Sequence, residues 1–125
     1  MRTLLLSELG GDFRKIRSKM SLRVSYDDLE ERGTDSGGGI IYYYQGQPLT
    51  GVIEEFKNGV LIGESEFTDG HMGGIQREYY LNGQINEECT IRFNNMEGTF
   101  TIWDENGNIT QRSQWEKGKQ ISEDI

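Results

Sequence analysis

The chain repeats itself every 24 residues. Glycines at turn-like positions recur at this interval, and apolar residues keep the same phase. The glycine series are Gly59, Gly83 and Gly107 in one register and Gly46, Gly70, Asn94 and Gly118 in another. The apolar series are Leu61, Ile85 and Ile109, and Tyr43, Phe67, Ile91 and Trp115. Several series in one phase predict an array of stacked supersecondary units.

Each unit alternates its residue types with a period of two. The segments 61–67, 85–91 and 109–115 carry apolar residues at the ends of one face and small or polar residues in its middle. This alternation is typical of strands. Segments 74–81 and 98–104 lie between them, and the joints are Asn58-Gly59, Asn82-Gly83 and Asn106-Gly107. Asn-Gly supplies the two positive-φ residues of a tight hairpin turn.

These units predict a mainly β fold, an antiparallel meander of stacked β-hairpins with about seven strands. The expected organisation is an N-terminal extension (1–19), a lead-in strand with an acidic turn and a Gly-rich link (20–39), the hairpin array (40–121) and a tail (122–125). The extension has apolar residues at helical spacing, but Gly10-Gly11 interrupts them. A short helix and a disordered extension both fit this pattern.

The turn segments resemble a known repeat family. Phe56-Lys57-Asn58-Gly59, residues 79–83 and residues 103–107 are similar to the aromatic-x-x-Asn-Gly core of the MORN repeat variant family. The lead-in 42–51 resembles the start of the array in bacterial antitoxin or immunity proteins of that family. The resemblance covers about Val24 to Ile121, and Asn94, Ile91 and Asp104 depart from it. It implies a sheet of hairpin repeats that binds a protein.

The formal charge of −8 is unevenly distributed. Residues 1–19 hold five basic and two acidic side chains, so the rest of the chain carries −11. Such a body repels phosphate backbones and anionic lipids, which argues against direct binding to nucleic acid or membranes. It favours a basic protein partner, although acidity also simply keeps proteins soluble.

Neither the cysteine content nor the hydropathy indicates an oxidising compartment or a membrane. The single Cys89 excludes an internal disulfide, and we interpret it as a small packing residue. Leu4-Leu5-Leu6 is too short for a signal sequence, and no apolar run is long enough to span a bilayer. We therefore expect a cytoplasmic protein.

Catalytic chemistry is weakly indicated. His71, the only histidine, lies in a Gly-rich turn with no sign of a positioned nucleophile. Asp104, Asn106 and Asn108 imitate the start of a calcium loop, but its later positions are wrong for the ion. Paired glutamates on exposed strands usually form a solvated face. We predict no enzyme, no cofactor and no metal site.

Acidic residues beside exposed aromatic side chains suggest a binding surface. The candidate partner-binding residues are Glu54, Glu55, Glu64, Glu66, Glu78, Tyr79, Tyr80 and Trp103. With the family resemblance, they suggest an immunity or antitoxin protein that occludes the active site of a cognate bacterial toxin with a basic surface. The alternative is a structural or scaffolding array that self-associates or recruits a partner through its unpaired edges. The oligomeric state stays open.

Overall fold

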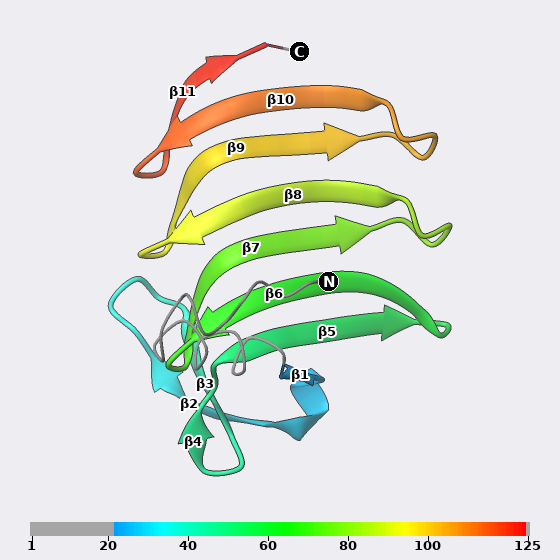
Figure 1. Ribbon diagram of the computed structural model, residues 1–125. Helices are drawn as coiled ribbons and strands as arrows, with labels where there is room; N and C mark the ends of the chain where they lie inside the picture. The colour runs from blue at the N-terminus through cyan, green and yellow to red at the C-terminus, as the bar shows by residue number, and fades with distance from the viewer. Residues whose placement is uncertain (1–21, 125) are drawn as a thin grey trace, which may run out of the picture.

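The computed structural model describes residues 22–124 and contains two sheets, whose strands are antiparallel except for the β1–β5 pair (Figure 1). The large sheet has the order β1-β5-β6-β7-β8-β9-β10-β11, and the small sheet has the order β2-β3-β4. Strands β5 to β11 follow one another as a seven-stranded meander, which confirms the predicted fold class. No helix within residues 22–124 is long and apolar enough to cross a membrane.

The strands of the meander are five to nine residues long. Their bounds are β5 (Gly51–Lys57), β6 (Val60–Thr68), β7 (His71–Tyr79), β8 (Ile85–Arg92), β9 (Asn95–Trp103), β10 (Ile109–Glu116) and β11 (Lys119–Glu123). The lead-in elements are β1 (Arg23–Val24), η1 (Tyr26–Asp28), β2 (Leu29–Thr34), β3 (Ile40–Tyr44) and β4 (Gln47–Pro48).

The lead-in differs from its expected form. The sequence of the lead-in predicts a strand from Leu22 to Tyr26, but β1 covers only Arg23–Val24, because Ser25 caps the 3-10 turn η1. This short strand pairs with β5 in parallel. The hairpin around Gly46 fits the 24-residue spacing but lies in the small sheet, not in the meander. The question of a helical or disordered extension falls on residues 1–19, outside the described part of the chain.

The hydrophobic core lies at one end of the array, where the small sheet meets β5 and β6. Its buried members are Val24, Leu49, Ile53 and Phe67, and Leu22, Leu29, Tyr42 and Tyr44 pack against them. The Tyr42 and Phe67 rings pack edge to face, with their centroids 5.6 Å apart. Strands β8 to β11 contribute no residue to this cluster. Among the described residues, the far part of the sheet is therefore a single layer, and in Figure 1 no other labelled element lies over β8 to β11.

Two kinds of turn connect the hairpins. The pairs Gln45-Gly46, Asn58-Gly59, Asp69-Gly70, Phe93-Asn94 and Lys117-Gly118 have positive φ at both residues, which is the type I′ geometry. Asn82-Gly83 and Asn106-Gly107 were expected to do the same, but only their glycines have positive φ. There the glycine N–H donates to the carbonyl three residues earlier, as in a three-residue loop with a bulge. That part of the prediction was wrong.

The core location gives a matched pair of phenylalanine substitutions. Phe67 is 2% exposed and Phe56 is 58% exposed, and both lie on strands of the same hairpin. Phe67→Ala should lower the free energy of unfolding by about 3–5 kcal/mol because it leaves a cavity in the core. Phe56→Ala should change it by less than about 1 kcal/mol. Urea unfolding of both variants checks this, and equal losses would contradict a core confined to this end.

Gly70 gives a second matched pair with Gly46, because both occupy the second central position of a type I′ turn. A Cβ at Gly70 would lie 3.0 Å from Ile41 Cγ2 and 3.2 Å from the Tyr42 carbonyl oxygen, whereas Gly46 has nothing within 4 Å. Both alanine variants strain the backbone by about 1–2 kcal/mol. Gly70→Ala should lower the melting temperature further than Gly46→Ala, since it also pushes the two sheets apart. Equal melting temperatures would show that this close approach does not matter.

Candidate functional site

The strand register aligns side chains into rows that cross the large sheet. Residues directly opposite each other on paired strands share a face. One such row, here called the acidic row, runs Glu55, Gly63, Glu78, Glu87, Ile102, Gln111. It contains three glutamates and no basic residue. None of these glutamates forms a salt bridge with a described residue.

The opposite face carries a row in which charges compensate, here called the ion-pair row. It runs Glu54, Glu64, Arg77, Glu88, Thr101, Arg112. Arg23 pairs with Glu54 at 2.5 Å and also with Glu64, and Arg77 Nε lies 2.7 Å from Glu88. Arg112 Nη2 lies 3.1 Å from Asp124 Oδ2, so each arginine of the row has an acidic partner. The two faces of one sheet thus differ in their electrostatics.

A groove of about 330 Å³ lies on the face of the acidic row. We call it the acidic–apolar groove, because carboxylates line one half and apolar side chains line the other. Its lining includes Glu55, Gly63, Ser65, Gln76, Glu78, Glu87 and Cys89, and on the apolar side Met72, Ile91, Met96 and Phe100. Arg77 also borders it, but its guanidinium is paired with Glu88 on the opposite face.

Small residues at mid-strand make room for this groove. Gly63 is buried, and a Cβ built there would lie 3.0 Å from Glu55 Oε1. Ser65 and Cys89 continue the floor on β6 and β8. The small middle positions in the sequence pattern therefore leave a hollow between the larger side chains at both strand ends.

The acidic half of the groove is an electronegative environment. Burial raises the pKa of Glu87, and the neighbouring Glu78 carboxylate raises it further. Burial also raises the pKa of the Cys89 thiol, with added contributions from Glu87 and Glu78. Gln76 Oε1, beside them, is a buried acceptor that has no hydrogen-bond partner among the described residues. This half offers hydrogen-bond acceptors in excess of donors.

The apolar half continues into a second hollow at the turn between β8 and β9. Its volume is about 450 Å³, and it shares Met72 and Ile91 with the groove. Phe93 borders it and is 82% exposed. This phenylalanine has φ of 51°, a left-handed conformation that side chains rarely adopt. Gln45, Asp69 and Lys117 occupy the same turn position in the other units, so an aromatic residue here is unusual for the array.

The structure divides the predicted acidic residues between the two faces. Glu54 and Glu64 belong to the ion-pair row, whereas Glu55 and Glu78 belong to the acidic row. Glu66 supports the backbone, since its Oε1 accepts a hydrogen bond from the Ile75 N–H at 2.9 Å. These glutamates therefore do not form one surface.

The predicted aromatic residues hold neighbouring strands together. The Tyr79 hydroxyl donates to Glu64 Oε1 at 2.5 Å, and burial together with this carboxylate raises the pKa of Tyr79 to about 12. The Tyr80 hydroxyl donates to the Trp103 carbonyl oxygen at 2.6 Å and links successive units. Asn82, two residues further along the chain, forms a second hydrogen bond between the units by donating its side-chain N–H to the Glu105 carbonyl oxygen. Tyr79 and Tyr80 thus stabilise the array.

Two other sequence candidates have structural roles. Asp104 accepts hydrogen bonds from the N–H groups of Asn106 and Asn108 at 2.9 Å, and these bonds lower its pKa. It therefore caps a turn. His71 Nδ1 lies 2.8 Å from Asp35 Oδ2, which joins the 34–39 link to the array. Within residues 22–124, no three His, Cys, Asp or Glu side chains are grouped so as to hold a metal ion.

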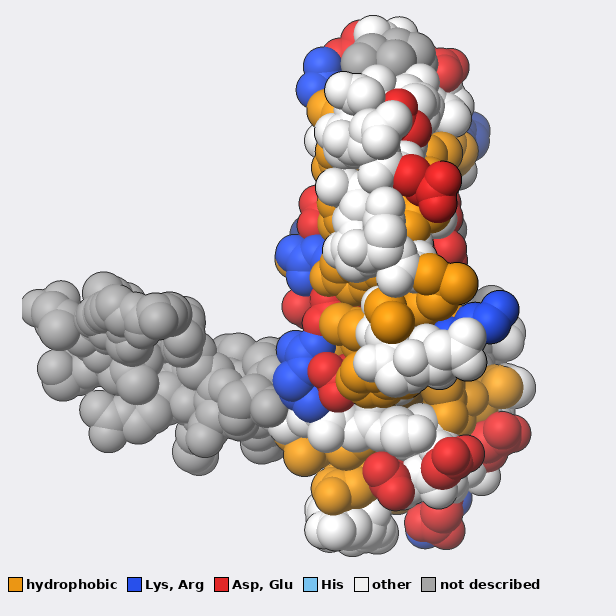
Figure 2. Space-filling view, turned by 90° about the vertical axis from the view of Figure 1, so that its right-hand side faces the viewer, with side chains coloured by type: hydrophobic (Ala, Val, Ile, Leu, Met, Phe, Trp, Pro, Cys, Tyr) orange, Lys and Arg blue, Asp and Glu red, His pale blue; other side chains and the backbone are white. Residues whose placement is uncertain are grey.

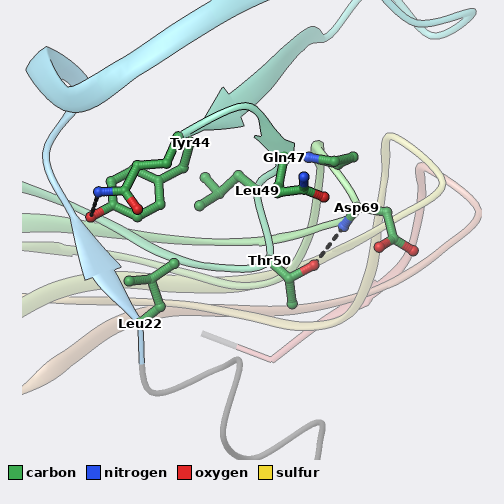
Figure 3. Close-up of a pocket in the computed structure, with 8 residues that line it drawn as sticks. Leu22, Tyr44, Gln47, Leu49, Thr50 and Asp69 are labelled. Carbon is green, nitrogen blue, oxygen red and sulfur yellow. Dashed lines mark hydrogen bonds between the residues drawn. The ribbon is translucent and has the colours of Figure 1, made fainter.

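A further hollow, of about 400 Å³, lies at the junction of the two sheets (Figure 3). Leu22, Tyr44 and Leu49 line it, and all three also pack in the core cluster. The Thr50 hydroxyl accepts a hydrogen bond from the Asp69 N–H at 2.9 Å across its rim. These contacts stabilise the junction, and the hollow has no cluster of charged side chains.

Apolar side chains are also exposed at the end of the sheet where β5, β7 and β9 turn into the next strands. Figure 2, which views this end, shows apolar side chains between charged ones along a narrow column. Phe56 and Leu81 are 58% and 52% exposed. They stand beside turns and line neither the acidic–apolar groove nor the hollow that Phe93 borders.

Comparisons with known proteins support the repeat assignment for two hairpins. Residues 72–92 and 96–117 each match the MORN repeat variant family, which corresponds to β7–β8 and β9–β10. The two matches together cover less than half of the chain. MORN repeats are non-enzymatic repeat modules that generally bind proteins. No curated protein and no solved structure matched the chain.

The two faces predict opposite effects for two adjacent glutamates on β8. Glu87→Gln should raise the free energy of unfolding at pH 7 by up to about 1 kcal/mol, because it removes a like charge opposite Glu78. Glu88→Gln should lower it by up to about 1 kcal/mol, because Arg77 loses the shorter of its two ion pairs and keeps only the one with Glu64 at 3.8 Å. Urea unfolding of both variants measures this difference.

The pH dependence of the Glu87 variant follows from the raised pKa. A carboxyl group whose pKa is higher in the folded state binds its proton more tightly there, so it favours folding at low pH. The advantage of Glu87→Gln should therefore be full at pH values above the folded pKa of Glu87 and disappear as the pH falls through that pKa to the ordinary range of a glutamate. An advantage that is independent of pH would contradict the raised pKa.

Proposed function

We propose that this chain is a non-enzymatic protein-binding module that neutralises a cognate bacterial toxin in the cytoplasm by covering its basic active site. The observation that carries the proposal is the difference between the two faces of the sheet. One face pairs its glutamates with arginines, and the other presents Glu55, Glu78 and Glu87 without a basic neighbour in their row.

The physical reason is charge complementarity. Toxins that act on nucleic acids need a basic groove for the phosphate backbone. A sheet with uncompensated carboxylates is attracted to such a groove and repels the nucleic acid that competes for it. The single-layer array is long and open, so that one face can cover an active site while the other remains in solvent. The resemblance to immunity proteins agrees with this proposal.

A second candidate function is self-association through the C-terminal edge. All residues of β11 are exposed, Ile121 at 61%, and β10 is the only strand that pairs with it among the described residues. An edge of this kind can pair with a strand of a second copy. Sedimentation velocity over a wide concentration range distinguishes the candidates, since a concentration-independent monomer excludes self-association.

Co-expression with the product of the neighbouring gene tests the toxin proposal. We expect restored growth, co-purification of the two proteins, and affinity that falls as salt is raised. Glu55→Lys with Glu78→Lys should weaken the complex by at least about tenfold, equivalent to about 1.4 kcal/mol. Glu105→Lys with Glu116→Lys makes the same change in net charge away from the acidic row and should have a much smaller effect. No rescue and no co-purification would end the proposal.

A further inference from the structure

We infer that the acidic–apolar groove binds a basic protein segment in two places, with an arginine side chain between Glu55, Glu78 and Glu87 and an apolar side chain against Met72, Ile91 and Phe93. This inference rests on the proposed function and specifies how the partner is recognised. It names one ligand chemistry, which can be tested without the toxin.

The acidic half of the groove fits a guanidinium group. Glu78 lies directly between Gly63 and Glu87 in the register, so three carboxylates line a short stretch across β5 to β8. The groove also has Gln76, whose Nε2 donates to the Glu66 carbonyl oxygen at 3.3 Å and whose buried Oε1 lacks a partner. Guanidinium has five N–H donors and no acceptor, and it binds carboxylates with two parallel hydrogen bonds.

The like charges of Glu78 and Glu87 give an independent reason to expect a cation. Two carboxylates that face each other across adjacent strands destabilise the folded chain. A bound guanidinium removes this repulsion, because its charge lies between them. Lysine would satisfy the charge, but not the planar two-carboxylate geometry.

The apolar half provides the second contact. Met72, Ile91 and Met96 line it, and Phe93 stands at its end with most of its ring in solvent. Methionine side chains adapt to different apolar ligands. Phe93 is held in a left-handed backbone conformation that asparagine or glycine would adopt with less strain. Strain of this kind is characteristic of functional sites.

The distance between the halves sets the spacing of the ligand. Ile91 follows Glu87 by four residues on β8, which is about 13 Å along a strand. An extended partner segment would place an arginine and an apolar residue four positions apart, on the same side of its own backbone. The two contacts would together fix both the position and the direction of the segment.

The test is a titration of the isotopically labelled protein with a short peptide, followed by amide chemical shifts. The probe is acetyl-Ser-Arg-Ser-Ser-Ser-Leu-Ser-amide, and the controls replace its arginine by citrulline or its leucine by alanine. We expect shifts concentrated on β7 and β8 around Glu78, Glu87 and Ile91. Citrulline, which is neutral and nearly isosteric, should weaken binding by at least about fivefold.

Protein variants locate the binding site. Glu78→Gln with Glu87→Gln should weaken binding of the probe peptide by at least about fivefold, whereas Glu105→Gln with Glu116→Gln, away from the acidic row, should leave it unchanged. Phe93→Asn should weaken binding of the probe peptide, because the leucine loses an apolar contact. It should also raise the melting temperature, because asparagine tolerates the left-handed backbone. A phenylalanine that only fills a turn would give the rise without the loss of binding.

The outcomes for the groove and for the toxin role can be told apart. Absence of binding, equal binding of the citrulline peptide, or equal losses in the two double variants would overturn the inference. If the variant with Glu78→Gln and Glu87→Gln neutralises the toxin as well as the unchanged protein does, the inference is also overturned. The proposed function would then remain intact. Binding of the arginine peptide without any toxin neutralisation would support the groove and contradict the toxin role.

Discussion

The packing of Phe67 against Ile53, Leu49 and Tyr42 anchors the rest of the structure. These side chains lie where the small sheet meets β5 and β6, and two of the strands that form the core junction also begin the meander. Beyond this point each strand is held by its neighbours through backbone hydrogen bonds and cross-strand rows. Repeat arrays of this kind are stabilised mainly by contacts between adjacent units. Because the core is at one end, no second layer among the described residues packs on β8 to β10.

The pleat of the sheet turns this openness into two different surfaces. Glu87 and Glu88 are adjacent in sequence, yet one faces Glu78 in the acidic row and the other faces Arg77 in the ion-pair row. The ion-pair row contributes to the stability of a thin sheet that has little apolar area to bury. The acidic row lowers that stability and instead provides a surface for a basic partner. Trade-offs between stability and binding are common at functional sites.

Much of the fold could be predicted because the 24-residue period and the two-residue alternation are local. The period placed Phe67 and Ile91 on equivalent positions and led to a meander of the correct strand number. The turn geometry at Asn82 and Asn106 was missed, since it depends on the loop length chosen by the flanking residues. The parallel pairing of β1 with β5 was also missed, because it joins segments that are distant in sequence.

The candidate site was less predictable because it depends on register. An uninterrupted hairpin around Gly83 would place Glu78 opposite Asn86, but a register shift places it opposite Glu87. The sequence alone therefore could not separate paired glutamates from unpaired ones. Phe93 did have a signal, because the other units carry Gln45, Asp69 or Lys117 at its position. An aromatic residue at a position that is polar in every other unit is a reason to look for a binding contact.

Native-state hydrogen exchange tests most directly whether the array depends on a core at one end. The account predicts that backbone amides of β5 and β6 exchange only through global unfolding, and that protection decreases along the meander to β11. Uniform protection over all seven strands, or the strongest protection at β10 and β11, would contradict it. Either result would mean that the outer strands are stabilised by something other than their neighbours and the core around Phe67.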